Sequence, residues 1–377
     1  MLMNSMAVAA LLSAVALSAA AQVKVGVIVG STGPGASLGI PYKNTFSALP
    51  KTLGGQPVQY IVMDDATDPT NAVKLTRKVI TEENVDLVIG SSTVPASAAM
   101  SEVASELKTP QIALSPVGGA AAKNAWVFSV PQPVNIMMGA VAEHMKANNV
   151  KNVAYIGFAD GWGDLVLSGL KANADSAGIK IVAEERYARL DTSVAGQVLK
   201  ILATNPDAVV VGGSGTPGAL PNITLVERGY KGKIYHNHGV INKDFLRIGG
   251  KSLEGAFAPT GPVMVAEQLP DSNPIKKVAL EFTKAYEGAF GAGSRNAFSA
   301  YSYDAYLLAD SAVANASKKA KPGTPEFRQA VRDALESTKD IVGTHGVYSM
   351  SPNDHAGVDQ RARALVRVEN GDWKLVR

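Results

Sequence analysis

Short apolar runs alternate with longer amphipathic segments through the first third of the chain. The apolar runs are rich in β-branched residues and predict buried strands, and the segments between them have the spacing of helices. The clearest helix begins at Asp68-Pro69, because an N-cap side chain is followed by proline in the first helical position. The strands predicted in this region are Val23–Val29, Val58–Met63, Val85–Ile89, Gln111–Leu114 and Trp126–Ser129.

The same alternation restarts after a helix predicted over Asn135–Asn148. Strands are predicted over Val153–Gly157, Ile179–Arg186, Ala208–Val211 and Lys233–His236, and helices over Trp162–Ala177, Val194–Ala203 and Gly218–Arg228. After Pro259, helices are predicted over Pro274–Phe290, Phe298–Ala316 and Thr324–Ser337, and strands over Val347–Met350, Ala364–Val368 and Trp373–Val376. Strands that alternate with helices at this spacing indicate an α/β fold, with parallel sheets flanked by helices.

Two stretches with the same rhythm predict two similar α/β lobes. The late helices and strands must join lobes that are already formed, so we expect the chain to cross between the lobes more than once. Segments 130–134, 259–263 and 343–350 are rich in Gly, Pro or Ser and are the expected crossings. We therefore expect residues 22–132 and 264–345 in the first lobe, and residues 133–263 and 346–377 in the second.

The N-terminus has the pattern of an export signal. Residues 7–21 are Ala, Val and Leu except for Ser13 and Ser18, and small residues precede Gln22. The run has the length of a signal-peptide core and is short for a membrane span. Residues 1–6 carry no Lys or Arg, which departs from the usual pattern, and a buried N-terminal helix is the alternative. We expect residues 1–21 to be a cleaved signal peptide.

Composition excludes several classes of function. The 377 residues include 36 Lys and Arg against 33 Asp and Glu, a balance that gives no electrostatic footprint for nucleic acid. Cysteine is absent, which excludes disulfides, thiol catalysis and zinc sites of the cysteine type. Apolar residues make up 46% of the chain, enough for a sizeable core in each lobe.

Catalytic and metal motifs are incomplete. Gly30 and Gly35 have the spacing of a phosphate-binding loop, but Ala36 stands where the loop needs Lys. The segment around Ser37 matches GxSxG, yet Ser37 lies well past the strand, where a polar loop is the favoured interpretation. His236 and His238 have no third ligand nearby in sequence. We expect no catalytic residues, no metal and no cofactor; an exported serine hydrolase that uses Ser37 remains the alternative.

Several segments together resemble the periplasmic binding proteins of ABC importers for branched-chain amino acids and related small carboxylates. The resemblance covers nearly all of the chain from Val23 onward, and it rests on the order and spacing of short pieces. These pieces are Val25-Gly26-Val27, Thr32-Gly33-Pro34, Leu38-Gly39, Asp64-Asp65, Asp68-Pro69, Ile89-Gly90-Ser91-Ser92-Thr93, Ser115-Pro116, Trp162-Gly163, Tyr301, Asp304-Ala305 and Gly343-Thr344-His345-Gly346.

The resemblance implies two Rossmann-like lobes joined by three crossovers, with a ligand cleft between them. It implies a monomer in the periplasm that closes on a small carboxylate and delivers it to the permease and ATPase subunits of an ABC transporter. A sensor subunit is an alternative role. Residues that follow the first-lobe strands are expected to hold the carboxylate with hydroxyls and amides, without Arg. They are Ser91, Ser92, Thr93, Ser115, Val117, Gly118 and Gly119.

The second lobe departs from the amino-acid binders, which hold the ligand ammonium with an acidic residue and an aromatic hydroxyl. The matching positions are His238 and Ser214, and neither carries a fixed negative charge. Leu38 stands where the family often has an aromatic residue, and Trp162 keeps the aromatic wall. We therefore predict an organic acid without an ammonium group, first of all an aromatic acid of the benzoate or phenylpropanoid type. A branched-chain or other neutral amino acid is the alternative, and an amide or urea-like solute ranks third.

Overall fold

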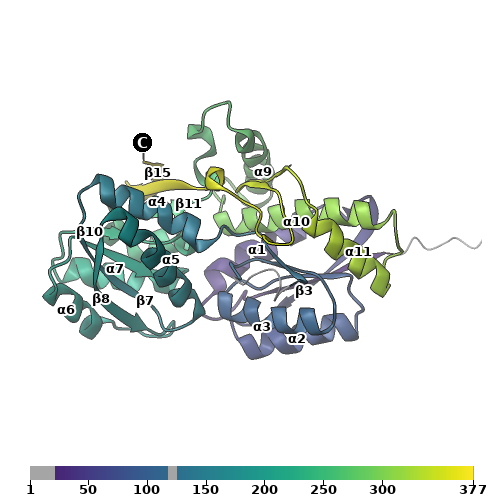
Figure 1. Ribbon diagram of the computed structural model, residues 1–377, viewed down its shortest axis with the longest axis horizontal. Coiled ribbons are helices and arrows are strands. Elements are labelled where there is room, and N and C mark those ends of the chain that lie inside the picture. Colours follow the sequence, from purple (N-terminus) through teal and green to yellow (C-terminus); the bar gives the residue numbers. More distant parts are fainter. Residues whose placement is uncertain (1–21, 118–124, 377) are drawn as a thin grey trace, which may run out of the picture.

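The computed structural model describes residues 22–117 and 125–376. Figure 1 shows two lobes side by side, each built on its own sheet with helices packed against it. The α/β fold class and the two-lobe architecture predicted from the sequence are thus confirmed. No helix within these described residues is long and apolar enough to cross a membrane.

The sheet of the first lobe has the strand order β2-β3-β1-β4-β5-β6. All neighbours are parallel except β2, which pairs antiparallel with β3. Helices cover both faces at the centre of this sheet, which is why the central strands β1 and β4 are nearly continuous apolar runs. The strands are β1 (Val23–Val29), β2 (Thr52–Leu53), β3 (Gln56–Asp64), β4 (Leu87–Gly90), β5 (Gln111–Ala113) and β6 (Val127–Ser129).

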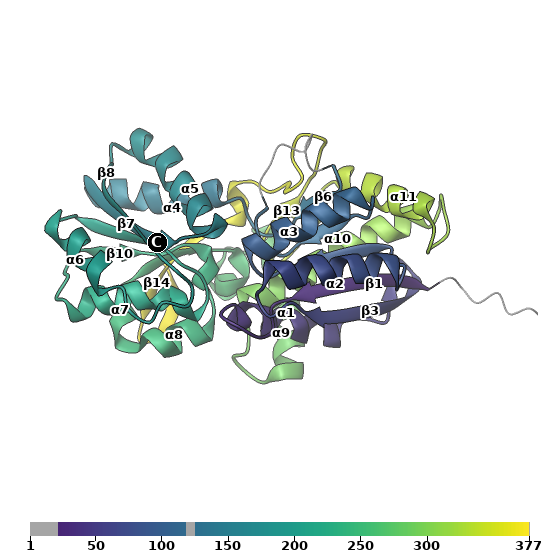
Figure 2. The same ribbon diagram turned by 90° about the horizontal axis from the view of Figure 1, so that it is seen from below.

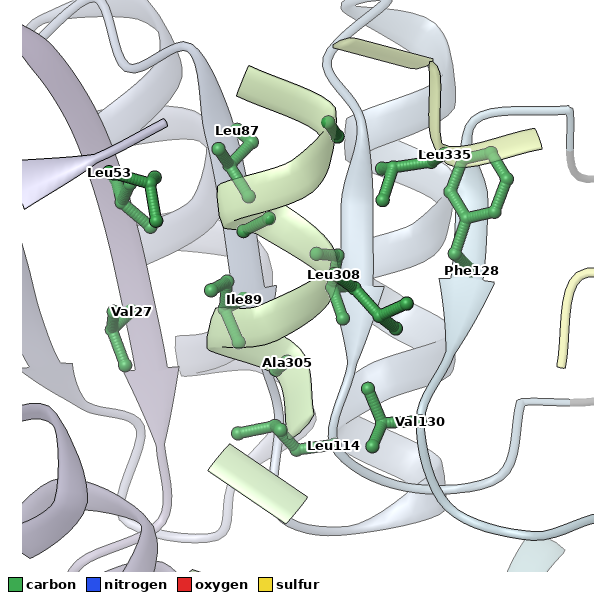
Figure 3. Packing of buried hydrophobic residues seen from close by; sticks show 14 of the residues in the cluster. Val27, Leu53, Leu87, Ile89, Leu114, Phe128, Val130, Ala305, Leu308 and Leu335 are labelled. Atoms are coloured by element: carbon green, nitrogen blue, oxygen red, sulfur yellow. The ribbon is translucent and has the colours of Figure 1, made fainter. Parts of the chain in front are cut away.

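Two groups of helices enclose this sheet. Helices α2 (Pro69–Thr81) and α3 (Val94–Glu106) lie on one face, as Figure 1 shows. The other face is covered by α1 (Ala36–Ala48), α10 (Ala297–Ala316) and α11 (Pro325–Glu336). In Figure 3, Leu308 of α10 lies in the same buried cluster as Ile89 of β4 and Phe128 of β6. Helices from late in the chain therefore complete the core of the first lobe.

The sheet of the second lobe has the order β15-β14-β11-β10-β9-β7-β8. The strands are β7 (Asn152–Phe158), β8 (Lys180–Tyr187), β9 (Ala208–Gly212), β10 (Lys233–Tyr235), β11 (Phe257–Thr260), β14 (Ala364–Glu369) and β15 (Asp372–Leu375). The first five are parallel, and the C-terminal hairpin of β14 and β15 adds to β11 antiparallel.

Helices flank the second sheet as well. Figure 2 shows α4 (Val134–Ala147) and α5 (Gly161–Ala177) on one side, with α7 (Leu220–Glu227) and α8 (Lys243–Gly249) on the other. The remaining elements are α6 (Ala195–Ala203), α9 (Pro274–Phe290), and the short pair β12 (Ile341–Val342) and β13 (Val347–Tyr348). Short 3-10 turns at Thr216–Ala219 (η2) and His238–Val240 (η3) follow β9 and β10.

The crossovers between the lobes meet in one buried joint made of Gln132, Gly261 and His345. Gln132 Nε2 lies 3.4 Å from His345 Nδ1. A methyl group on Gly261 would lie 1.8 Å from the same His345 nitrogen, so this position has room only for glycine. Tyr301 of α10 donates a hydrogen bond of 2.5 Å to Gln132 Oε1 and stacks on the His345 ring. The three chain segments are thus held together by direct contact.

The structure corrects three expectations. Residues 36–48 form helix α1 where a polar loop around Ser37 was predicted, because burial of Leu38, Tyr42 and Phe46 along one face outweighs Pro41 inside the helix. The segment expected as the second crossing begins within strand β11. The chain after residue 346 was assigned to the second lobe, yet Tyr348, Met350, Val358 and Ala362 pack in the core of the first. The lobe boundaries otherwise stay predictions.

Candidate ligand-binding cleft

A pocket between the lobes is lined by residues that follow the carboxyl ends of strands in both sheets. The cavity that it encloses has a volume of about 30 Å³. This edge of a parallel sheet is where open α/β folds bind ligands. Of the residues predicted from the sequence, the pocket brings together Leu38, Ser92, Thr93, Ser115, Trp162, Ser214 and His238. The others that line it are Tyr42, Val94, Leu114, Pro116, Pro131, Arg189, Gly239, Phe298 and Tyr301.

The first-lobe side of the pocket offers hydrogen-bond donors. Ser92 and Thr93 lie between β4 and α3, and the Thr93 side chain makes no capping hydrogen bond to the helix. Ser115 follows β5 and is buried, and its hydroxyl has no partner among the described residues. A helix N-terminus favours negative charge, and a buried hydroxyl without a partner is costly. This side of the pocket can therefore accept a carboxylate.

The second-lobe side presents a fixed aromatic wall. Trp162 lies in the first turn of α5, and its indole Nε1 donates a hydrogen bond of 3.1 Å to the carbonyl of Gly213. The Trp162 ring meets the His238 ring edge to face, with centroids 5.3 Å apart. Because Nε1 is already bonded, Trp162 presents only its apolar surface to a ligand.

His238 is a buried, neutral group in this wall. It is 3% exposed, and neither ring nitrogen has a hydrogen-bond partner within the described part of the chain. Burial lowers the pKa of His238 to about 3, so the imidazole is uncharged at neutral pH. A neutral imidazole carries one donor and one acceptor nitrogen. His238 is therefore able both to give and to accept a hydrogen bond in the pocket.

Arg189 lines the pocket and was not predicted from the sequence. It follows β8, and its Nε lies 2.6 Å from Asp160 Oδ2. Its Nη1 donates a hydrogen bond of 3.1 Å to Ser214 Oγ, and its guanidinium lies 4.3 Å from the centre of the Phe158 ring. Nη2 is buried and has no partner among the residues that the structure describes. The rule that located Ser115, a polar residue just after a strand, could also have drawn attention to Arg189.

Asp160 balances this guanidinium and is fully engaged. Its Oδ1 accepts hydrogen bonds from the backbone N–H groups of Trp162 and Gly163 at the start of α5, and its Oδ2 is paired with Arg189. The carboxylate therefore both caps the helix and fixes the arginine. Its charge is committed to these partners, and the pocket itself is lined by a cation and neutral groups.

Other predicted residues lie elsewhere. The Ser91 hydroxyl donates to the buried carboxylate of Asp65, and the Ser91 backbone N–H donates to Ser97 Oγ, 2.7 Å away. Val117 lines a separate hollow beside Val134 and Leu165. Gly118 and Gly119 lie outside the described residues. The ligand roles of these four, like those of the residues that line the pocket, stay predictions.

The two lobes touch across the pocket. The Ser37 hydroxyl, in the first turn of α1, accepts a hydrogen bond of 3.2 Å from the backbone N–H of Thr216 in η2. A methyl group on Gly215 would come within 2.6 Å of Leu38 Cδ1, which shows how closely the lobes approach. The structure therefore represents a closed arrangement. Within residues 22–117 and 125–376, no group of three His, Asp or Glu side chains is placed to hold a metal ion.

The chain passes three times between two α/β lobes, and the lobes close over a pocket at the carboxyl ends of their strands. This arrangement is that of a clamshell ligand-binding protein. The comparisons with known proteins agree with this class. The chain belongs to the periplasmic binding protein family, whose model matches residues 22–372. It is thus a periplasmic binding protein of the ABC-transporter type, a class that binds small-molecule ligands and works with ABC transporters.

Its relatives carry different ligand names. An extracellular ligand-binding receptor from Rhodopseudomonas palustris HaA2 is 48% identical, covers 94% of this chain and 100% of its own, and superposes with a TM-score of 0.91. An amino acid binding protein of Pseudomonas aeruginosa is 25% identical over 250 residues, 62% of this chain and 64% of the relative's length. A solute binding protein from R. palustris in complex with benzoate is 20% identical, with a TM-score of 0.79, and the match covers 94% of this chain and 95% of that protein. This last likeness concerns the fold alone.

Proposed function

We propose that this protein captures a small organic acid without an α-ammonium group, first of all an aromatic acid of the benzoate or phenylpropanoid type, and delivers it to an ABC permease. The observation that carries the proposal is the second-lobe end of the cleft. It holds the Arg189 guanidinium and the neutral His238, and its nearest carboxylate, Asp160, is already paired. These groups can donate hydrogen bonds to an oxygen acceptor, and they leave no free negative charge for an ammonium group.

The first-lobe side is proposed to hold the ligand carboxylate. Ser115 Oγ is buried without a partner in the described residues, and Thr93 leaves the amides of the first turn of α3 without a side-chain cap. Hydrogen bonds to a charged group contribute about 1.5–3 kcal/mol each. A carboxylate in this position would satisfy the Ser115 hydroxyl and the helix end together.

The walls of the cleft favour a flat apolar body. Trp162 lies on the second-lobe side, and Leu38, Tyr42 and Phe298 lie on the first-lobe side. The Tyr42 hydroxyl donates a hydrogen bond of 2.6 Å to the carbonyl of Leu114, so its polar end is engaged and its ring remains as packing surface. Aromatic rings in contact contribute about 0.5–1.5 kcal/mol beyond the area that they bury. An aromatic ring is therefore the ligand body that these residues fit best.

An amino acid would leave its ammonium in an unfavourable place. The ammonium would lose water beside a guanidinium, and the pocket supplies no free carboxylate to replace that hydration. An unpaired ion removed from water costs several kcal/mol. The name of the P. aeruginosa relative, an amino acid binding protein, supports the alternative function, binding of a neutral amino acid. Leucine is therefore a necessary ligand in any test.

Calorimetry with 4-hydroxybenzoate and its methyl ester tests the carboxylate site. We expect the ester to bind at least tenfold more weakly, a loss of about 1.4 kcal/mol or more. Ser115→Ala should weaken binding of the acid by about tenfold or more, because one hydrogen bond to a charged group is lost. Ser105→Ala is the matched control, because its hydroxyl also lacks a partner in the described chain but lies at the far end of α3. Equal affinity for acid and ester would exclude a carboxylate grip.

We also propose that the protein is a binder and performs no catalysis. The Ser37 hydroxyl, the nucleophile of the alternative hydrolase, accepts a hydrogen bond from the backbone N–H of Thr216 across the closed cleft. This contact gives Ser37 a role in closure. Hydrolysis of a small ester by the wild type, lost in Ser37→Ala, would support the hydrolase instead.

A further inference from the structure

We infer that Arg189, Ser214 and His238 together recognise an oxygen acceptor at the end of the ligand opposite its carboxylate. The inference rests on the proposed function and deepens it. The ligand would then be an acid with polar groups at both ends and an apolar body between them, such as a 4-hydroxy aromatic acid. The observation that carries it is the hydrogen-bond inventory of these three side chains.

Arg189 has only donors to offer. A guanidinium carries five N–H groups and no acceptor. Its Nε is paired with Asp160 Oδ2, its Nη1 donates to Ser214 Oγ, and one face packs on the Phe158 ring. Nη2 is the nitrogen that remains, buried and without a partner among the described residues. Because Arg189 lines the pocket, a ligand atom that accepts a hydrogen bond is the partner that Nη2 lacks.

Ser214 is turned into a donor by the same contact. Its hydroxyl oxygen accepts from Arg189 Nη1, so its single hydrogen is free for another acceptor. His238, across the pocket wall, adds one donor nitrogen and one acceptor nitrogen, neither of which has a partner in the described part of the chain. The second-lobe end therefore offers one group that can only donate, Arg189, and two that can both donate and accept, Ser214 and His238.

Few chemical groups match this pattern. A phenolic hydroxyl accepts through its lone pairs from Arg189 and Ser214, and it donates its hydrogen to the acceptor nitrogen of His238. A second carboxylate would pair with the guanidinium but would leave the acceptor nitrogen of His238 unsatisfied. An aromatic amine is similar in size to the hydroxyl, but its single lone pair is delocalised into the ring, so its nitrogen is a poorer acceptor for Arg189 Nη2 than a hydroxyl oxygen. A bare C–H leaves Nη2 buried and unpaired, which is unfavourable.

The guanidinium is held firmly enough to discriminate between such groups. Asp160 is itself fixed by two backbone N–H groups at the start of α5, and the Arg189 side chain is only 12% exposed. The guanidinium is planar, and its Nε and Nη1 already have partners, so Nη2 points in one fixed direction. Lysine at this position could reach one of these partners but could not hold all of them in a fixed plane.

The test is calorimetry of the mature protein at pH 7.5 with benzoate, 4-hydroxybenzoate and 4-aminobenzoate. We expect 4-hydroxybenzoate to bind at least tenfold more tightly than the other two. In Arg189→Gln this advantage over benzoate should shrink below threefold. In Arg186→Gln it should persist, because Arg186 lies near the end of β8, three residues before Arg189, and pairs with Asp164 outside the pocket. Thermal unfolding of both variants checks that they fold.

The wild-type series decides the question even if Arg189→Gln does not fold. Equal binding of 4-aminobenzoate and 4-hydroxybenzoate, or an advantage that survives in Arg189→Gln, would overturn the inference. If benzoate binds as tightly as 4-hydroxybenzoate, the proposed function is retained, but the inference that Arg189, Ser214 and His238 recognise an oxygen acceptor of the ligand is wrong. If leucine binds and none of the three acids does, the proposed function itself fails.

Discussion

Replacing His236 by glutamine should remove a defined part of the acid sensitivity of this protein. The His236 side chain is fully buried against Phe245, and its Nε2 lies 3.0 Å from Asn222 Oδ1. Since that oxygen only accepts, the neutral ring carries its proton on Nε2. Burial lowers the pKa of His236 to about 3, against about 6.5 for an exposed ring. Glutamine can keep the hydrogen bond to Asn222 and has no proton to gain.

The sign and size of the effect follow from linkage. The unfolded chain takes up a proton at His236 as the pH falls below about 6.5, and the folded chain does not. Folding therefore loses stability as the pH falls through that range. Between pH 7.5 and 5.5 the loss from this one residue is about 1.4 kcal/mol, a sizeable share of the 5–15 kcal/mol typical of folded domains.

Urea denaturation of the wild type and His236→Gln at both pH values measures the difference directly. Other groups also titrate: burial lowers the pKa of His345 to about 3 and raises that of Asp304 to about 6. Their contributions oppose each other and are common to both proteins. The drop in the free energy of unfolding should be about 1.4 kcal/mol smaller in the variant. An identical drop in both proteins would show that His236 titrates in the folded state, and the buried assignment would be wrong.

Three further predictions concern the joint, the lobe contact and the N-terminus. Gly261→Ala should weaken binding of 4-hydroxybenzoate at least tenfold in calorimetry, because the new methyl group would collide with His345 and displace the joint. Gly288→Ala, where the added methyl group meets open space, should leave the affinity unchanged. Equal affinity in the two variants would show that the joint does not control binding. Ser37→Ala should weaken the same ligand about fivefold, for a hydrogen bond of about 1 kcal/mol made only between closed lobes; an unchanged affinity would mean that the contact does not contribute to closure. Mass spectrometry of the exported protein should find Gln22 at its N-terminus, and an intact Met1 there would refute cleavage.

Much of the fold could be predicted because its central strands, such as β1 and β9, are buried on both faces. Strand β1 was predicted with its observed bounds, Val23–Val29, and α9 with its bounds Pro274–Phe290, because apolar periodicity and a proline at the first helical position are local signals. Helix α1 was missed because Pro41 interrupts its pattern and tertiary burial determines its structure. Local sequence patterns predict local structure, and they fail where tertiary packing determines the conformation of a segment.

Residues of the cleft could be predicted only where they directly follow the carboxyl end of a strand. Residues just after strand ends, such as Ser115 and Ser214, could be placed from the sequence, since parallel strands bring their carboxyl ends together. Arg189 also follows a strand, but the partners of a long side chain depend on how the neighbouring loops pack. Tyr42 and Phe298 reach the pocket from helices, one of them far along the chain. Their positions depend on the tertiary arrangement, which sequence spacing does not encode.

The most direct test of the proposed function compares leucine with its deaminated isostere, 4-methylpentanoate, in calorimetry on the wild-type protein. The two ligands share the carboxylate and the apolar body and differ only in the ammonium. Because Arg189 is cationic, His238 is neutral and Asp160 is already paired, the deaminated acid should bind at least tenfold more tightly, a difference of about 1.4 kcal/mol or more. Leucine that binds more tightly than 4-methylpentanoate would contradict the account and establish an amino-acid binder.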